Sequence, residues 1–347
     1  MAKRVIRQSP GIYINEPGIL KSIEEILADL EIQYPVIVTD ELVKKVTADF
    51  LPAHFYETYP LFLFAGANTF AEVSRLVDLI SQFQVDGLIA LGGGQLMDNA
   101  KLVADQLKVK LINIQTVPSN CAALTTKSIV YNHAHEMIES VRIANPIAAV
   151  LIEPRLLKES PRPYLNSGIG DTLAKFYEIR RRLPKDRLSL ATEKAARFFL
   201  DECRDEIIAV KGVDQLESEQ LINFLDTVFL FAAAVDGFAD SNGRSVAAHT
   251  FYNAFMKVKG VTKFTHGEIV ALGNLIQVEL EANQGLISEI HSYYPHFGLP
   301  EKLSDLAISD REAREIAIQM TDVQNERMQS IFPAISAEQI LAVFERL

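Results

Sequence analysis

Five short apolar runs in the first half of the chain limit its fold more than any other feature. They are PVIVTD (35–40), LFLFAG (61–66), DGLIALGGG (86–94), VKLINIQTV (109–117) and IAAVLIEP (147–154). The runs are apolar throughout instead of alternating, which is typical of parallel strands covered on both faces. Amphipathic segments such as 71–83, with Val73, Leu76 and Ile80 at helical spacing, lie between them. The order strand, helix, strand predicts a doubly wound α/β domain.

The second half of the chain has a different pattern. From Asn166 onward, beyond Pro161 and Pro163, the sequence contains long helical periodicities and no convincing strand. We therefore predict an α/β domain over residues 1–160 and an all-helical domain over residues 161–347. A length of 347 residues fits two domains.

Composition and charge exclude several classes of function. With 34 Lys and Arg against 45 Asp and Glu, the formal net charge is −11, which disfavours nucleic acid and anionic membrane surfaces as partners. Two cysteines are too few for a disulfide scaffold. No uninterrupted apolar run approaches the ~18 residues of a membrane span, and the basic N-terminus lacks the apolar stretch of a signal peptide. We expect a cytoplasmic protein with a small-molecule partner.

The first chemical motif is LGGGQLMDNAK, from Leu91 to Lys101. Three glycines follow an apolar strand and precede a helix, whose free N–H groups suit an anion. The pattern differs from the G-x-G-x-x-G fingerprint of ordinary Rossmann domains. It fits either a phosphate-binding loop or a tight turn without a ligand, and the entropic cost of three glycines favours the former.

A carboxylate ends the strand at 35–40. Asp40 in this position is suited to accept hydrogen bonds from an adenosine ribose, and it would repel a 2′-phosphate. Asp40 is equally suited to cap the helix that follows it. Both interpretations remain open from the residues alone.

Three residues of the second half could bind a metal. Asp171 in GIGDTLAK, His249 in SVAAHTFYN and His266 in FTHGEIVALG each lie at or near the start of an apolar helical segment. One carboxylate and two imidazoles suit a divalent transition metal and leave a position for a substrate oxygen. Because the separations are long, spacing alone favours ordinary core histidines. His133 and His135, in a polar stretch between two expected strands, are better interpreted as part of an exposed turn.

Taken together, G-G-G-x-x-x-D-x-A-K, T-x-x-S, G-I-G-D, A-A-H and H-G-E resemble the iron-containing alcohol dehydrogenase superfamily, and its glycerol dehydrogenase-like branch most closely. The resemblance runs from about Arg7 to at least Gly298. It implies a dehydroquinate synthase-like architecture, in which an NAD-binding α/β domain precedes a helical metal-binding domain. It also implies an NAD- and metal-dependent dehydrogenase acting on a CH–OH group, and we expect a homo-oligomer.

The resemblance also assigns roles residue by residue. For the metal it implies Asp171, His249 and His266, which would also be the catalytic residues. For NAD it implies Asp40 at the adenosine ribose, Gly93, Gly94, Gln95 and Asp98 at the pyrophosphate, Thr116 and Ser119 at the cofactor riboses and adenine, and Thr125, Lys127 and Tyr131 on a strand beneath it.

Three positions depart from the family pattern. Cys121 stands where glycerol dehydrogenases place an aspartate that helps bind the polyol. Tyr252 replaces a second histidine that often follows the first metal histidine. Lys175 replaces a histidine ligand of the iron-dependent branch, so that the remaining ligands match zinc-using members. The resemblance therefore implies zinc in preference to iron.

Cys121 and Arg244 bear on the substrate. The residues around Cys121 resemble a sub-branch that reduces 2-oxo acids, and Arg244 precedes the first metal histidine as in that sub-branch. Arg244 could pair with a substrate carboxylate or simply lie on the surface. We predict interconversion of a small 2-hydroxy acid and its 2-oxo acid. The alternatives are a glycerol or polyol dehydrogenase, a dehydroquinate synthase-like lyase and a non-catalytic binding protein.

Overall fold

A computed structural model of the protein describes residues 5–132, 136–322 and 326–347. The chain divides into two compact units. One contains Arg7–Ser160 and Glu217–Ala233, and the other contains Pro161–Leu216 and Ala234–Leu347 with Val5 and Ile6. One division between the units follows Ser160, and the domain boundaries expected from the sequence stay a prediction. The segment 217–233, which the prediction assigned to the second half, groups instead with the α/β unit.

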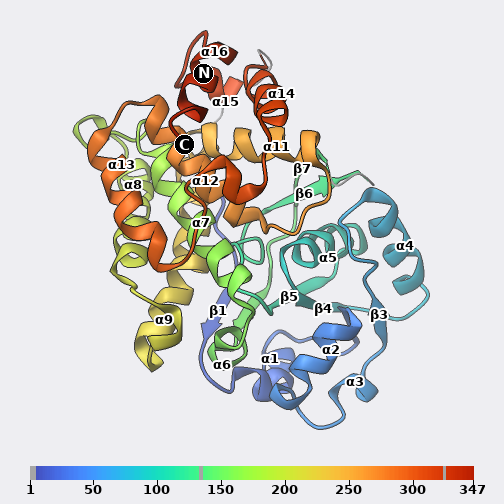
Figure 1. The fold of residues 1–347 in the computed structure, drawn as a ribbon. Coiled ribbons are helices and arrows are strands. Elements are labelled where there is room, and N and C mark those ends of the chain that lie inside the picture. The colour runs from blue at the N-terminus through green and yellow to red at the C-terminus, as the bar shows by residue number, and fades with distance from the viewer. Residues whose placement is uncertain (1–4, 133–135, 323–325) are drawn as a thin grey trace. The chain divides into compact units, whose positions relative to one another are not determined.

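A six-stranded parallel sheet forms the centre of the α/β unit (Figure 1). Its order is β1 (Ile12–Asn15), β8 (Ala149–Ile152), β5 (Lys110–Gln115), β4 (Gly87–Gly92), β2 (Pro35–Thr39) and β3 (Leu61–Leu63). Each of the five predicted runs forms one of these strands. Strand β1 was not predicted, because this short, half-buried edge strand pairs only with β8 and carries no continuous apolar run.

Helices cover both faces of this sheet, which explains the continuous apolar strands. On one face, α1 (Ile23–Asp29) and α2 (Glu41–Thr47) pack on a buried cluster that includes Ile37 and Ile89. On the other face lie α4 (Phe70–Ile80) and α5 (Gly94–Leu107) (Figure 1). The unit also contains α3 (Phe55–Thr58), α6 (Pro154–Lys158) and α9 (Ser218–Asp226). The predicted doubly wound fold is confirmed.

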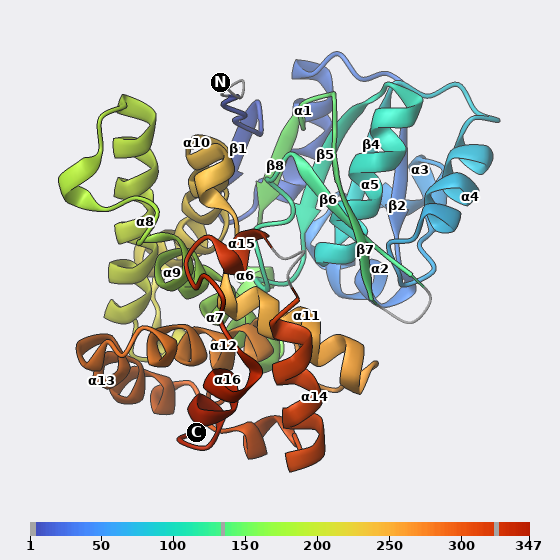
Figure 2. The ribbon, with the colours of Figure 1, turned by 90° about the horizontal axis from the view of Figure 1, so that it is seen from above.

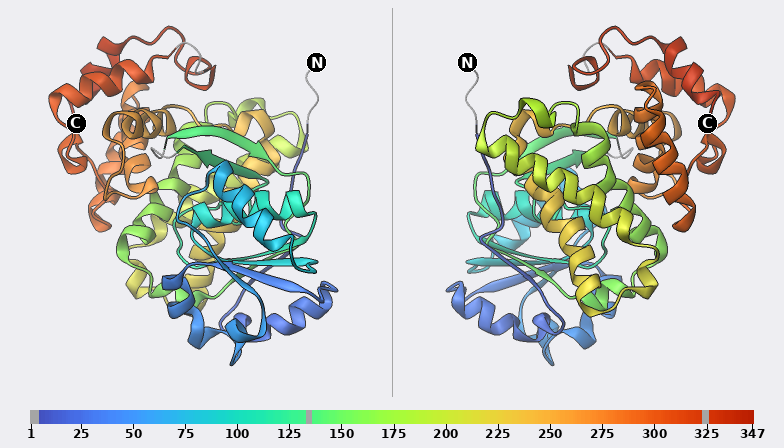
Figure 3. Two further views of the ribbon diagram at one scale, coloured as in Figure 1. Left: turned by 90° about the vertical axis from the view of Figure 1, so that its right-hand side faces the viewer. Right: turned by 90° about the vertical axis from the view of Figure 1, so that its left-hand side faces the viewer.

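Two further elements complete the α/β unit. An antiparallel hairpin pairs β6 (Lys127–Tyr131) with β7 (Met137–Arg142), and the predicted turn at His133 and His135 lies outside the described residues. Helix α9 lies beside β1 at the edge of the sheet (Figure 3). The Asp226 carboxylate at its end accepts hydrogen bonds from Asn15 Nδ2 and Tyr13 Oη, each at 2.7 Å.

The other unit contains no strand among its described residues, as predicted for an all-helical domain. Its helices are α7 (Arg162–Ile179), α8 (Ala191–Ala209), α10 (Ala232–Ala239), α11 (Ala247–Lys259), α12 (His266–Leu280), α13 (Gln284–Tyr293), α14 (Asp310–Met320), α15 (Glu326–Gln329) and α16 (Ala337–Phe344). Helix α12 is buried at Gly267 and from Ile269 to Val278, and it forms the centre of the unit (Figure 2). Helix α12 therefore has no solvent face over this stretch, as expected of a core helix.

One helical run, Ser218–Gly243, is long and apolar enough to cross a membrane by length and composition alone. Of its apolar window, 61% is buried inside the protein. This burial is what the core helix of a folded protein shows.

Candidate metal and cofactor sites

The structure brings the three predicted metal ligands together. Asp171 lies in α7, His249 in α11 and His266 begins α12, and the ligand atoms of all three lie within 4.8 Å of one another. Asp171 Oδ1 lies 3.2 Å from His266 Nε2 and 3.4 Å from His249 Nε2. Residues almost 100 positions apart in the sequence therefore form one cluster.

Glycines next to the ligands allow the three helices to approach this closely. A Cβ on Gly170, the residue before Asp171, would lie 2.1 Å from the carbonyl oxygen of Gly267, the residue after His266. A Cβ on Gly273 of α12 would lie 2.6 Å from the carbonyl oxygen of Ala248, the residue before His249. Any side chain at these glycines would push the helices apart and separate the ligands. Gly170 of G-I-G-D and Gly267 of H-G-E thus have a packing reason.

Two of the three distances between the ligand atoms fit a tetrahedral divalent ion. Metal–nitrogen and metal–oxygen bonds of about 2.0–2.1 Å place neighbouring ligand atoms of a tetrahedron about 3.3 Å apart. The two distances from Asp171 to the imidazoles, 3.2 and 3.4 Å, match this edge. Three protein ligands leave one coordination position for a substrate or water, as in catalytic zinc sites.

The surroundings of the cluster favour a cation. Burial alone would raise the pKa of Asp171, yet hydrogen bonds from His249 and His266 bring it well below its usual range. Burial alone would lower the pKa of His249, but the carboxylates of Glu178 and Asp171 raise it to about 9. The site therefore stabilises positive charge, which either a proton or a metal ion can supply.

Sequence reasoning missed one residue of this site, Glu178. It is buried, follows Asp171 by seven residues and so lies two turns along the same face of α7. Its Oε2 lies 2.6 Å from His249 Nδ1. The spacing D-x6-E on one helix was the available signal. Tyr252, the substitution noted in the sequence, packs its ring edge-on against His266 with centroids 4.3 Å apart.

In the α/β unit, the predicted cofactor residues gather at one edge of the sheet. Asp40 follows β2, Gly93 follows β4 and Thr116 follows β5, and these three strands are neighbours in the order β5-β4-β2. The carboxyl ends of parallel strands meet at the same edge. The chain leaves β2 for β3 on one side and returns to β4 on the other, and ligands of open α/β sheets bind at such a switch point.

The three glycines act through close packing, which corrects the conformational argument made from the sequence. None of Gly92, Gly93 and Gly94 has a positive φ. A Cβ would lie 2.7 Å from Leu96 Cδ1 at Gly92, 3.2 Å from Val117 Cγ2 at Gly93 and 2.7 Å from Asn120 Nδ2 at Gly94. The loop after β5 thus packs directly on Gly93 and Gly94, and Leu96 of α5 packs on Gly92. No side chain caps α5 at Gly93, so the first N–H groups of this 14-residue helix remain suited to an anion.

Asp40 performs the capping role that the sequence also allowed. Its Oδ1 accepts a hydrogen bond from Val43 N at 2.8 Å and so caps α2. This contact uses one carboxylate oxygen. The cap and a contact from the second oxygen to a ribose are therefore compatible.

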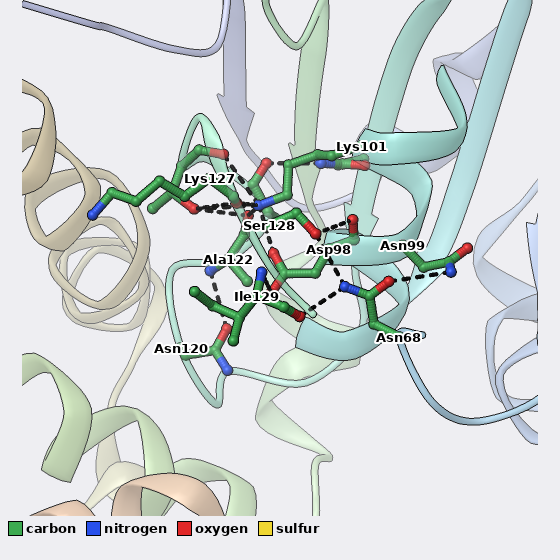
Figure 4. A network of polar contacts seen from close by, with 12 residues as sticks. Asn68, Asp98, Asn99, Lys101, Asn120, Ala122, Lys127, Ser128 and Ile129 are labelled. Carbon is green, nitrogen blue, oxygen red and sulfur yellow. Dashed lines mark hydrogen bonds and ion pairs between the residues drawn. The ribbon is translucent and has the colours of Figure 1, made fainter. Parts of the chain in front are cut away.

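Asp98 points into the protein. Its Oδ1 lies 2.6 Å from Lys101 Nζ, and its Oδ2 accepts a hydrogen bond from Ile129 N at 3.0 Å (Figure 4). Lys101 Nζ also donates to the carbonyls of Ala122 and Thr125, at 2.9 and 3.1 Å, and to that of Lys127. The pair therefore ties the loop 122–127 and strand β6 to helix α5. The pyrophosphate role implied for Asp98 stays a prediction, and this geometry favours an indirect one.

The remaining predicted residues lie on the segments that this pair secures. Gln95 accepts a hydrogen bond from Asn68 N at 3.1 Å, and Ser119 and Cys121 are buried in the loop after β5. Thr125, Lys127 and Tyr131 lie in or just before β6. In the helical unit, Arg244 is exposed and its carbonyl accepts a hydrogen bond from Arg182.

The chain is similar in sequence to known dehydrogenases. Residues 10–152 match the family model described as iron-containing alcohol dehydrogenase. Hydroxycarboxylate dehydrogenase A of Escherichia coli (strain K12) is 27% identical over 315 residues, covering 88% of this chain and 86% of that protein. Glycerol dehydrogenase of Thermotoga maritima is 25% identical over 329 residues, covering 90% of this chain and 88% of that protein.

Solved structures agree on the fold. The crystal structure of a probable glycerol dehydrogenase from Sinorhizobium meliloti 1021 has a TM-score of 0.83 at 22% identity, and 99% of each chain is covered. The glycerol dehydrogenase of Schizosaccharomyces pombe has the same TM-score at 21% identity. The resemblance stated from the sequence motifs is confirmed.

Proposed function

We propose that this chain is a member of the iron-containing alcohol dehydrogenase superfamily, in its glycerol dehydrogenase-like branch, and that it catalyses a specific reaction. The chain is a metal-dependent NAD oxidoreductase of small alcohols. Its substrate pair is a small 2-hydroxy acid and the corresponding 2-oxo acid. We also expect the protein to be cytoplasmic and to form a homo-oligomer. Light scattering of the purified protein would test the oligomeric state.

The observation that carries this proposal is the cluster of Asp171, His249 and His266, whose ligand atoms lie within 4.8 Å. A divalent ion held there, zinc in preference to iron, supplies a Lewis acid for the substrate oxygen. The chain itself positions the three ligands through close-packed helices and keeps Asp171 ionised through the two imidazoles. No side chain of the cluster is free to act as a general base, so we expect the proton to leave through water or a cofactor hydroxyl.

The sheet edge supports NAD as the hydride carrier. The uncapped N-terminus of α5 suits the pyrophosphate, with Gly93, Gly94 and Gln95 at its start. The second oxygen of Asp40 suits the adenosine ribose and disfavours NADP by like-charge repulsion. Thr116 and Ser119 follow the next strand, and Thr125, Lys127 and Tyr131 lie on the hairpin that Lys101 secures.

Two residues support a carboxylate on the substrate. Cys121 is neutral and buried, and it removes the acidic polyol contact that would repel an anion. Arg244 is exposed in the loop before α11 and pairs with no carboxylate among the described residues. A relative of 27% identity is named a hydroxycarboxylate dehydrogenase, whereas glycerol dehydrogenases of 23–27% identity support a polyol as the competing substrate.

Steady-state kinetics on lactate-like acids, their 2-oxo acids, glycerol and 1,2-diols would test the proposal. We expect the acid pair to be preferred, and Arg244→Ala to raise its KM at least about tenfold because a bidentate ion pair is lost. The matched control is Arg314→Ala, an exposed arginine on α14, which should leave KM unchanged. Faster turnover of glycerol together with indifference to Arg244→Ala would favour the polyol reaction.

A further inference from the structure

Glu178 contacts both the backbone at the start of α11 and the imidazole ring of His249. Its side chain is 2% exposed and directs both oxygens at the start of α11. Oε1 accepts hydrogen bonds from Val246 N at 2.7 Å and from His249 N at 3.0 Å. Oε2 lies 2.6 Å from His249 Nδ1. Val246, the N-cap residue of α11, provides no side-chain cap, so Glu178 of α7 caps α11 from outside that helix.

The contact with Nδ1 determines where the imidazole carries its proton. An ionised carboxylate can only accept hydrogen bonds, so His249 Nδ1 must donate. A neutral ring then has its lone pair on Nε2. This Nε2 is the atom that lies 3.4 Å from Asp171 Oδ1, on the side of the cluster. The contact thus leaves the correct nitrogen free for a metal ion.

We propose that Glu178 is a positioning residue that holds His249 in its Nδ1–H tautomer and fixes the orientation of its ring toward the metal. The inference rests on the metal site of the proposed function. Backbone and side chain of His249 are both bonded to this one carboxylate, so the helix start and the ligand ring are fixed together. Loss of a carboxylate that accepts a hydrogen bond from a metal-binding histidine typically lowers metal affinity or activity by about 10- to 100-fold.

The substitution Glu178→Gln tests the tautomer directly. A glutamine keeps an oxygen for the two N–H groups of α11, so its amide NH₂ replaces Oε2 and can only donate. His249 Nδ1 would have to accept, which moves the proton to Nε2 and blocks the metal side. We expect zinc affinity, measured by chelator competition with the stripped protein, to fall at least tenfold while far-UV circular dichroism shows that the metal-free variant remains folded.

The control is Glu281→Gln, which alters another buried glutamate of the helical unit. Glu281 caps the end of α12 and pairs with Arg180 and Gln277. Its loss should lower stability and leave zinc affinity unchanged. Unchanged affinity in Glu178→Gln would overturn the inference, as would an equal loss of affinity in both variants. A wild-type protein without zinc affinity would overturn the proposed function as well.

A measurement on the wild type keeps the inference testable if Glu178→Gln does not fold. Nitrogen-15 spectra of histidine-labelled, zinc-loaded protein distinguish Nδ1–H from Nε2–H rings, and His249→Gln identifies the signal. We expect a protonated Nδ1 on a zinc-bound His249. A proton on Nε2 of His249 would overturn the proposal.

Discussion

Two buried aspartates, one in each unit, are neutralised in opposite ways. Asp98 of α5 faces Lys101, whose ammonium also donates to carbonyls of the neighbouring loop. Asp171 of α7 faces two imidazoles, His249 and His266. Each of the two aspartates is at most 6% exposed, so each carboxylate needs a compensating positive charge.

The difference lies in whether the compensating charge is permanent. A lysine ammonium supplies its own charge and closes the Asp98 site, which then serves only to hold α5, β6 and the loop together. Imidazoles can give up their protons, so a divalent ion can take their place beside Asp171. The same kind of buried carboxylate is therefore structural in one unit and suited to function in the other.

The largest effect should follow from removing the charge of Asp171. Asp171→Asn keeps the size of the side chain but removes the anionic ligand, and we expect kcat/KM to fall by at least about 1,000-fold, or about 4 kcal/mol. Far-UV circular dichroism should remain native, because the ligands do not close a structural site. Retained activity in metal-stripped Asp171→Asn would contradict the comparison.

Lys101 should respond through stability instead of chemistry. Lys101→Met leaves Asp98 buried without a cation, which typically costs about 3–5 kcal/mol in the free energy of unfolding. Urea denaturation would measure it. Adding Asp98→Asn should recover part of this loss, because no unpaired charge remains and the contact with Ile129 N can persist. A single variant as stable as the wild type would show that the Asp98 site is not closed in this way.

Asp40 combines the structural role of Asp98 with the functional role of Asp171, because only one of its oxygens is used by the helix cap. Asp40→Asn retains a side-chain oxygen for Val43 N and removes the charge that would repel a 2′-phosphate. We expect the preference for NAD over NADP to fall by about tenfold or more with little change in the melting temperature. An unchanged ratio of kcat/KM values would show that Asp40 acts only as a cap.

The smallest effect concerns Glu312, a carboxylate near the surface. Hydrogen bonds from the backbone and hydroxyl of Ser309 and from Lys259 lower the pKa of Glu312 to about 2. A depressed folded-state pKa stabilises the protein above the unfolded value of about 4.5 and ceases to do so as the pH falls toward 2. Since its side chain is 27% exposed, solvent screening limits this to about 1 kcal/mol or less.

Urea midpoints of the wild type and Glu312→Gln would test this pH dependence. The difference should be constant near neutral pH and shrink below about pH 4.5. A difference that grows on acidification would have the wrong sign.

Much of the α/β unit could be predicted from the sequence, because its information is local. A buried parallel strand needs a continuous apolar run, and a glycine turn lies next to its strand and helix in the chain. PVIVTD and LGGG could therefore be recognised from the sequence alone. Strand β1 and the segment Glu217–Ala233 could not be assigned this way. Strand β1 is placed by pairing with β8, and the segment Glu217–Ala233 is placed by the contact of Asp226 with β1. In both cases the partners are more than 130 residues apart in the sequence.

In the helical unit, by contrast, the sequence could not predict how the site is assembled. Residue types and motif resemblance nominated Asp171, His249 and His266, but helical periodicity contains no information on which helices touch. Only the tertiary structure decided that Gly170 and Gly267 allow backbone contact and so bring the ligand atoms within 4.8 Å. It also decided that Asp98 turns inward and that Glu178 faces His249, because the direction of a buried carboxylate is set by donors distant in sequence.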